Sequence, residues 1–78
     1  MVGRILKINP SRNMIAVISA ESEILIFEGY STEFEVGDTL SWDENEDVLQ
    51  NTTSGKSISV ILQENGVLLS NLDKRLLF

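Results

Sequence analysis

Two short apolar segments near the beginning of the chain, separated by a polar turn, constrain the fold more than any other feature. Residues 2–8 alternate loosely between apolar and polar side chains, and the sequence then reaches Asn9-Pro10, which ends a strand. Residues 14–19 form a nearly continuous apolar run. The pair predicts an antiparallel hairpin. Because the second strand is apolar at almost every position, either both of its faces are covered or one face is available to a partner.

The length and composition indicate a small fold without thiol or imidazole chemistry. With 78 residues, we expect one domain. The sequence contains no cysteine and no histidine, which excludes disulfides, the usual zinc sites and the commonest general base. No stretch is apolar enough to span a membrane, and no basic segment precedes an apolar run. We therefore expect a cytoplasmic protein without membrane attachment.

The charge of the chain is uneven. Twelve Asp and Glu against six Lys and Arg give a net charge of −6, which opposes binding to phosphate backbones. Arg4, Lys7 and Arg12 lie among the first dozen residues, whereas the segment 21–47 holds ten carboxylates and no basic residue. The sequence therefore predicts an acidic middle and one small basic cluster.

Polar turns divide the rest of the sequence into further short strands. We expect strands at residues 23–28, 39–42, 48–53 and 57–62. In the last of these, aliphatic side chains alternate on one face. Asn65-Gly66 then predicts a second hairpin, closed by a strand at residues 67–69.

These elements predict a mainly β fold, a small five- to six-stranded barrel of the OB or SH3 type with a C-terminal hairpin. We expect residues 1–78 to form one domain, with the barrel core at residues 2–53 and the extra hairpin and C-terminal segment at residues 54–78. Residues 70–78 fit a short helix with Ser70 as N-cap and with Leu69, Leu72 and Leu76 on its apolar side. A further strand or a frayed tail are the alternatives, because a helix this short exists only when it docks.

The order of the strand motifs resembles the cold-shock domain, a five-stranded barrel of the OB type. In that family a glycine begins a strand that ends in Asn-Pro, and Gly-Phe-Gly-Phe, Val-Phe-Val-His-Phe and Gly-x-x-Val-x-Phe strands follow. Here Gly3 stands at the same distance before Asn9-Pro10, and the later motifs correspond to residues 15–17, 24–27 and 37–42. The resemblance covers about residues 2–53 and implies a surface on the second and third strands that binds single-stranded nucleic acid.

The residues that would bind nucleic acid in a cold-shock domain are changed in this chain. Exposed aromatic side chains that stack on unpaired bases are worth about 1–3 kcal/mol each. In their places stand Lys7, Ile15, Val17 and Leu25, and only Phe27 is aromatic. The resemblance therefore implies that these five residues form a binding surface that has lost base stacking and is largely aliphatic.

The chain after residue 54 carries more apolar surface than a free tail would keep. Its large aliphatic residues include Ile58, Val60, Leu62, Leu68, Leu69, Leu72 and Leu76. We expect this segment to cover the face formed by Ile15, Val17 and Leu25, either within one chain or across a dimer, because monomers rarely expose such a patch.

Candidate chemistry elsewhere is limited to the acidic segment. Asp43-x-Asn45-x-Asp47 has the alternate oxygen side chains of a calcium loop. However, Val48 stands where the turn glycine belongs and Ser54 where the closing glutamate belongs, so a solvated acidic loop is the favoured interpretation. No nucleophile and base are arranged together, so we expect no enzymatic activity, no metal site and no cofactor.

The sequence therefore predicts a non-catalytic binding module that contacts another protein or a second copy of itself, with a homodimer as one possible form. The alternative is a divergent cold-shock-like binder of single-stranded nucleic acid that uses Arg4, Lys7, Arg12 and Phe27. A small enzyme or metal-binding domain is the third hypothesis.

Nucleic-acid binding should be weak or absent, because the net charge of −6 and the missing stacking residues act in the same direction. A mobility-shift assay at low salt with mixed single-stranded DNA and RNA measures this. Sub-micromolar, salt-sensitive binding would contradict the expectation. Lys7→Glu would then weaken binding to every sequence alike, since Lys7 supplies phosphate attraction and no base readout.

Overall fold

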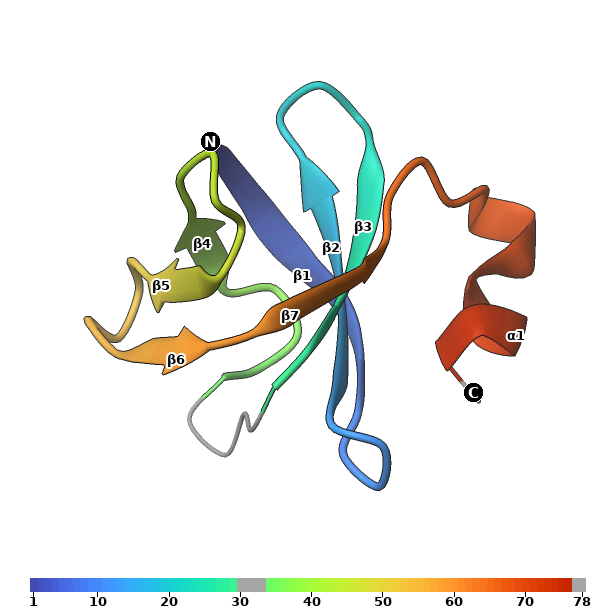
Figure 1. The fold of residues 1–78 in the computed structure, drawn as a ribbon, viewed down its shortest axis with the longest axis horizontal. Helices are drawn as coiled ribbons and strands as arrows, with labels where there is room; N and C mark the ends of the chain where they lie inside the picture. The colour runs from blue at the N-terminus through green and yellow to red at the C-terminus, as the bar shows by residue number, and fades with distance from the viewer. Residues whose placement is uncertain (30–33, 77–78) are drawn as a thin grey trace.

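The computed structural model describes residues 1–29 and 34–76. Within these residues the chain forms seven strands and a short C-terminal helix (Figure 1). The strands are β1 (Val2–Asn9), β2 (Met14–Ser19), β3 (Ile24–Glu28), β4 (Thr39–Ser41), β5 (Val48–Asn51), β6 (Ser57–Ser59) and β7 (Ile61–Glu64). A 3-10 turn, η1 (Leu69–Asn71), leads directly into helix α1 (Leu72–Leu76).

All seven strands belong to one antiparallel sheet with the order β6-β5-β4-β1-β2-β3-β7. β6 and β7 stand at the two ends of this order, although only Val60 separates them in the sequence. In Figure 1 the continuous segment that they form crosses in front of β1 and β2. The mainly β fold is confirmed. The strand pairing does not close the sheet into a barrel, so the predicted barrel is not confirmed.

β1 and β2 form the predicted hairpin. The turn between them contains Asn13 at a φ of 54°, a left-handed conformation that asparagine tolerates better than most residues. The register shifts between Ile5 and Lys7, which marks a β-bulge. Because the bulge interrupts the alternation of side chains, Ile5 and Ile8 both pack on one face of the sheet while Leu6 packs on the other.

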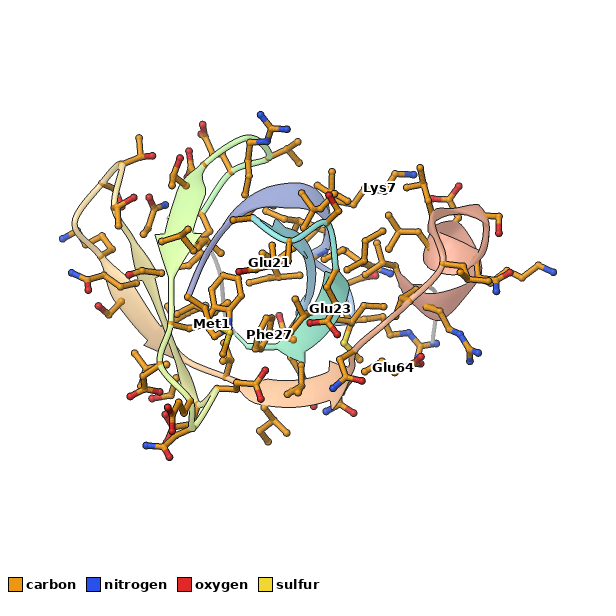
Figure 2. The ribbon with its side chains drawn as sticks, turned by 90° about the horizontal axis from the view of Figure 1, so that it is seen from above. Met1, Lys7, Glu21, Glu23, Phe27 and Glu64 are labelled. Atoms are coloured by element: carbon orange, nitrogen blue, oxygen red, sulfur yellow. The ribbon has the colours of Figure 1, made fainter. Side chains whose placement is uncertain are left out.

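The concave face of the sheet holds the larger apolar cluster, which we call the inner cluster. Near its centre the fully buried Phe27 meets Trp42 edge to face, with ring centroids 5.9 Å apart. Figure 2 shows Phe27 surrounded by the strands. The buried members of the inner cluster are Ile5, Ile15, Val17, Leu25, Phe27, Phe34, Leu40, Trp42, Leu49 and Val60, with Ile8, Ile58 and Leu62 partly buried against them. All seven strands therefore contribute to one core.

The opposite face of β2 and β3 carries a second apolar cluster, which we call the outer cluster. α1 packs on this face from outside and stands apart from β4, β5 and β6, as Figure 1 shows. The buried members of the outer cluster are Met14, Ala16, Ile24, Ile26, Leu72 and Leu76, with Leu6, Ile18 and Val67 partly buried against them. β2 and β3 are thus covered on both faces, which explains their nearly continuous apolar sequences.

A polar network around the buried side chain of Asn51 joins the turns that flank β4 and β5. The fully buried side chain of Asn51 donates from Nδ2 to Asp38 Oδ2 at 2.7 Å, and its Oδ1 accepts the backbone N–H groups of Thr53 and Ser54. The same Asp38 oxygen accepts the N–H of Glu35. Because the buried amide of Asn51 is paired at both its nitrogen and its oxygen, the network joins the two turns without leaving a buried polar atom of Asn51 unsatisfied.

The predicted hairpin at Asn65-Gly66 is wrong. The alternation expected at residues 57–62 is confirmed, since its three aliphatic side chains pack on the inner cluster. Residues 67–69, however, form no strand. The N–H of Val67 donates to the carbonyl of Ile24 at 3.1 Å, and the chain then leaves the sheet. β7 already pairs with β3, so the chain crosses to the outer face and does not return along β7.

Of the alternatives for the end of the chain, the helix is confirmed over Leu72–Leu76, and residues 77–78 of the predicted range lie outside the described residues. Ser70 lies inside the 3-10 turn and is not an N-cap. Leu69 is 71% exposed and does not share the apolar side with Leu72 and Leu76. The tighter 3-10 turn breaks the 3.6-residue spacing and rotates Leu69 away from the sheet.

Gly3→Ala should lower the free energy of unfolding by about 1–3 kcal/mol, the usual cost of overpacking. A Cβ at this position would lie 2.5 Å from the Ile18 carbonyl oxygen and 2.8 Å from the Trp42 ring. Urea denaturation followed by tryptophan fluorescence measures the change. Val2→Ala is the control, because Val2 is on the same strand and 50% exposed. Equal stability of the two variants would contradict the close approach.

Candidate functional site

The outward side chains of β2 and β3 form a continuous aliphatic face. Met14 and Ala16 point outward from β2, and Ile24 and Ile26 do the same from β3. The register pairs Ala16 with Ile26 and Ile18 with Ile24, so these side chains lie side by side across the two strands. This face is an apolar surface on which another element can pack.

α1 covers this face with two leucines. Leu72 and Leu76 are one helical turn apart and are 3% and 5% exposed. Leu68 and Leu69, which precede the helix in the same segment, are 65% and 71% exposed. The apolar contact between helix and sheet is therefore narrow.

Two ion pairs orient α1 on the strands. Lys7 of β1 pairs with Asp73, and Nε of Arg75 lies 3.5 Å from Oε2 of Glu64 at the end of β7. Figure 2 shows Lys7 between the strands and the helix. The four side chains are between 39% and 76% exposed. Ion pairs this exposed contribute at most about 1 kcal/mol each. They therefore orient the helix but add little to the free energy of its docking.

An open groove of about 570 Å³ lies beside α1, between the helix and the β1–β2 turn. Its lining consists of Lys7, Ile8, Asn9, Pro10, Val36, Asp73 and Leu76. Nδ2 of Asn9 donates to the carbonyl of Leu76 at this edge of the helix. Val36 is 63% exposed on the other side. The groove adjoins the outer cluster at Leu76.

The four apolar residues that the sequence analysis placed on a binding surface lie in the core. Ile15, Val17 and Phe27 are 0% exposed and Leu25 is 2% exposed, because all four point into the inner cluster. These four side chains are therefore in the core and not on the surface that the resemblance implied for them. Lys7 is the member of the predicted set that lies at the outer face, half-exposed and paired with an aspartate of α1.

The expectation that the chain after residue 54 covers Ile15, Val17 and Leu25 is confirmed for β6 and β7. Their aliphatic side chains pack with these three residues in the inner cluster. α1, at the end of the same segment, covers the opposite face. The two parts of the segment therefore bury β2 and β3 from both sides.

The sequence analysis does not name Met14, Ala16, Ile24 and Ile26 as a binding face, although the sequence carries a signal for a covered outer face. The run at residues 14–18 is apolar at every position, so each face of β2 receives aliphatic side chains. Of the two interpretations of this run, the one with both faces covered is confirmed.

Metal-binding and membrane-spanning features are absent from residues 1–29 and 34–76. No group of three or more carboxylate, histidine or cysteine side chains is placed to hold a metal ion in this part of the chain. In the acidic loop, Asp43 Oδ1 accepts the N–H of Asn45, and the Asp43 carbonyl accepts the N–H of Glu46. No helix in these ranges is long and apolar enough to cross a membrane.

No protein-family model matches the sequence, and neither the curated proteins nor the solved structures contain a match. The resemblance to cold-shock domains therefore has no support from relatives. The burial of Ile15, Val17, Leu25 and Phe27 also removes four of the five positions that the resemblance assigned to a nucleic-acid surface. The outer face has to be interpreted from its own geometry.

Leu72→Ala should increase trypsin cleavage after Lys74 and Arg75 by roughly tenfold or more. Removing a buried leucine side chain costs about 2 kcal/mol or more, and 1.4 kcal/mol already changes an opening equilibrium by about tenfold. Leu69→Ala is the matched control, because it shortens an exposed leucine of the same segment and should leave the rate unchanged. Equal cleavage rates in the two variants would show that Leu72 does not hold the helix.

Proposed function

We propose that this protein is a non-catalytic interaction module that binds an apolar helical segment of another protein on the outer face of β2 and β3. The observation that carries the proposal is an aliphatic sheet face covered by two leucines of a five-residue helix. An amphipathic helix laid on an apolar face is a common mode of peptide recognition. A protein partner is favoured because, among the described residues, the outer cluster contains no aromatic side chain on which a base would stack.

We further propose that the sheet works as a small barrel of the OB or SH3 type. The arrangement of its ends supports this, since β6 and β7 are joined through Val60, which is buried and donates its N–H to the carbonyl of Asp47. The contribution of all seven strands to the inner cluster is also typical of a filled small barrel. Such a frame would keep the outer face in place when α1 leaves it.

α1 binds the outer face weakly enough that a helix of a partner protein can replace it. Burying Leu72 and Leu76 contributes roughly 1.5–3 kcal/mol each, and the exposed ion pairs add at most about 1 kcal/mol each. Ordering the backbone costs about 1–2 kcal/mol per residue, and a helix of five residues is not stable alone. The gains and costs are of similar size. A partner helix with stronger apolar anchors therefore replaces α1.

The contacts of α1 define the chemistry of the partner. Leu72 and Leu76 require two large aliphatic side chains at positions i and i+4 of the incoming helix. Lys7 favours an acidic residue directly after the first anchor, where α1 has an aspartate. Glu64 favours a basic residue directly before the second anchor, where α1 has an arginine. α1 thus acts as an internal competitor for its own binding face.

The full chain carrying both Leu72→Asp and Leu76→Asp tests the proposal, because this change should release α1 and free the face. A synthetic peptide of residues 66–78 should bind this variant and shift the NMR methyl signals of the outer cluster. The wild-type chain should bind the peptide more weakly, in proportion to the fraction of molecules in which its own helix is released.

The matched control carries Leu68→Asp and Leu69→Asp, which place the same charges on exposed residues of the same segment. It should behave as the wild type. If the buried aspartates unfold the chain, the corresponding pair of alanine substitutions releases the helix more gently. A variant with a released helix and an intact inner cluster that does not bind the peptide would refute the proposal.

A further inference from the structure

The connection between β7 and η1 contains the only Asn-Gly pair of the sequence, Asn65-Gly66. Both residues are exposed, and Gly66 has a φ of +61°. Among the described residues, the N–H of Gly66 donates no backbone hydrogen bond, and the side chain of Asn65 has no hydrogen-bond partner. The side-chain amide and the following backbone nitrogen are therefore adjacent and unprotected.

We propose that Asn65 is a site of spontaneous deamidation, which converts the connection that carries α1 into an aspartyl or isoaspartyl linkage. The backbone nitrogen of Gly66 attacks Cγ of Asn65, the bond from Cγ to the side-chain nitrogen breaks, and ammonia leaves with the proton of the Gly66 N–H. Glycine permits this approach because it has no side chain in the way.

The succinimide ring formed in this way is then opened by water. Cleavage of the bond between Cγ and the Gly66 nitrogen restores a normal backbone with aspartate. Cleavage of the bond between the Asn65 backbone carbonyl carbon and the same nitrogen leaves Gly66 attached through the side chain, as isoaspartate. Overall, one water is consumed and one ammonia is released, and no oxidant or cofactor takes part.

After the other five asparagines of the sequence, the nitrogen that would attack is absent, belongs to a buried strand residue or already donates a hydrogen bond. Asn9 precedes Pro10, which has no N–H, and Asn13 precedes Met14, which is buried at the start of β2. Asn45, Asn51 and Asn71 precede Glu46, Thr52 and Leu72, whose N–H groups donate to the carbonyls of Asp43, Thr39 and Leu69. The fold therefore directs deamidation to one position.

Isoaspartate at position 65 would disturb the docking of α1 on the outer face. It adds a methylene group to the backbone between Glu64, which pairs with Arg75, and Val67, whose N–H bonds to the carbonyl of Ile24. Only two residues separate Glu64 from Val67, so the extra backbone length moves at least one of these two residues. The new carboxylate also stands beside Glu64 and repels it. Both effects weaken the docking of the helix.

Incubation of the folded wild-type protein at mildly alkaline pH, followed by peptide mass mapping, tests the site. We expect amide loss at Asn65, isoaspartate in excess of aspartate, and a rate of the same order as in urea-denatured protein. The other asparagines are internal controls and should keep their amides. Loss at Asn45 as fast as at Asn65, or strong suppression at Asn65 in the folded state, would overturn the proposal. Asn65→Gln should remain unmodified.

The consequence for α1 is tested by comparing the isolated isoaspartyl form with Asn65→Asp, which has the same charge and a normal backbone. Trypsin should cleave after Lys74 faster in the isoaspartyl form than in Asn65→Asp. Equal rates in these two proteins would show that the added methylene does not disturb the helix.

Discussion

The burial of β2 on both faces is the constraint on which the rest of the structure depends. A strand whose side chains are apolar in both directions exposes a large aliphatic surface unless each face meets another layer. The inner side chains of β2 are covered by β4 to β7 together with Phe34 and Trp42. The outer side chains are covered by the C-terminal segment. The curvature of the sheet and the position of α1 both follow from this requirement.

The strands could be predicted from the sequence because alternation and turn residues are local signals. The predicted bounds of β2 match the structure, and those of β1 and β3 differ by one residue at one end. The sequence did not predict which side chains of β2 point toward the inner cluster and which point outward. A shift of one residue moves a side chain to the other face, and an aliphatic run has no polar residue that indicates the choice. The resemblance to cold-shock domains places Ile15 and Val17 on a surface, whereas both are buried, and Lys7 is the residue of the predicted site that lies at the outer face.

The structure of the C-terminal segment could be predicted only in part, because it depends on contacts between residues that are distant in sequence. Asn65-Gly66 fits a tight hairpin and also fits the point where a chain leaves a sheet, and the local sequence does not distinguish them. The bond from the Val67 N–H to the Ile24 carbonyl decides between them, because it turns the chain toward the outer face. The spacing of Leu72 and Leu76 did predict a shared apolar side, whereas the 3-10 turn that excludes Leu69 has no equivalent signal.

The position of β6 and β7 at the two ends of the strand order also affects how copies of this chain would meet. Long unpaired strand edges recruit strands from other molecules and start cross-β growth. Here the terminal strands have three and four residues and belong to one segment joined at the buried Val60. A strand from another molecule that paired along β6 would reach Val60 after three residues. Beyond Val60 the chain continues as β7, which already pairs with β3. The terminal strands therefore offer only short edges for pairing with another molecule.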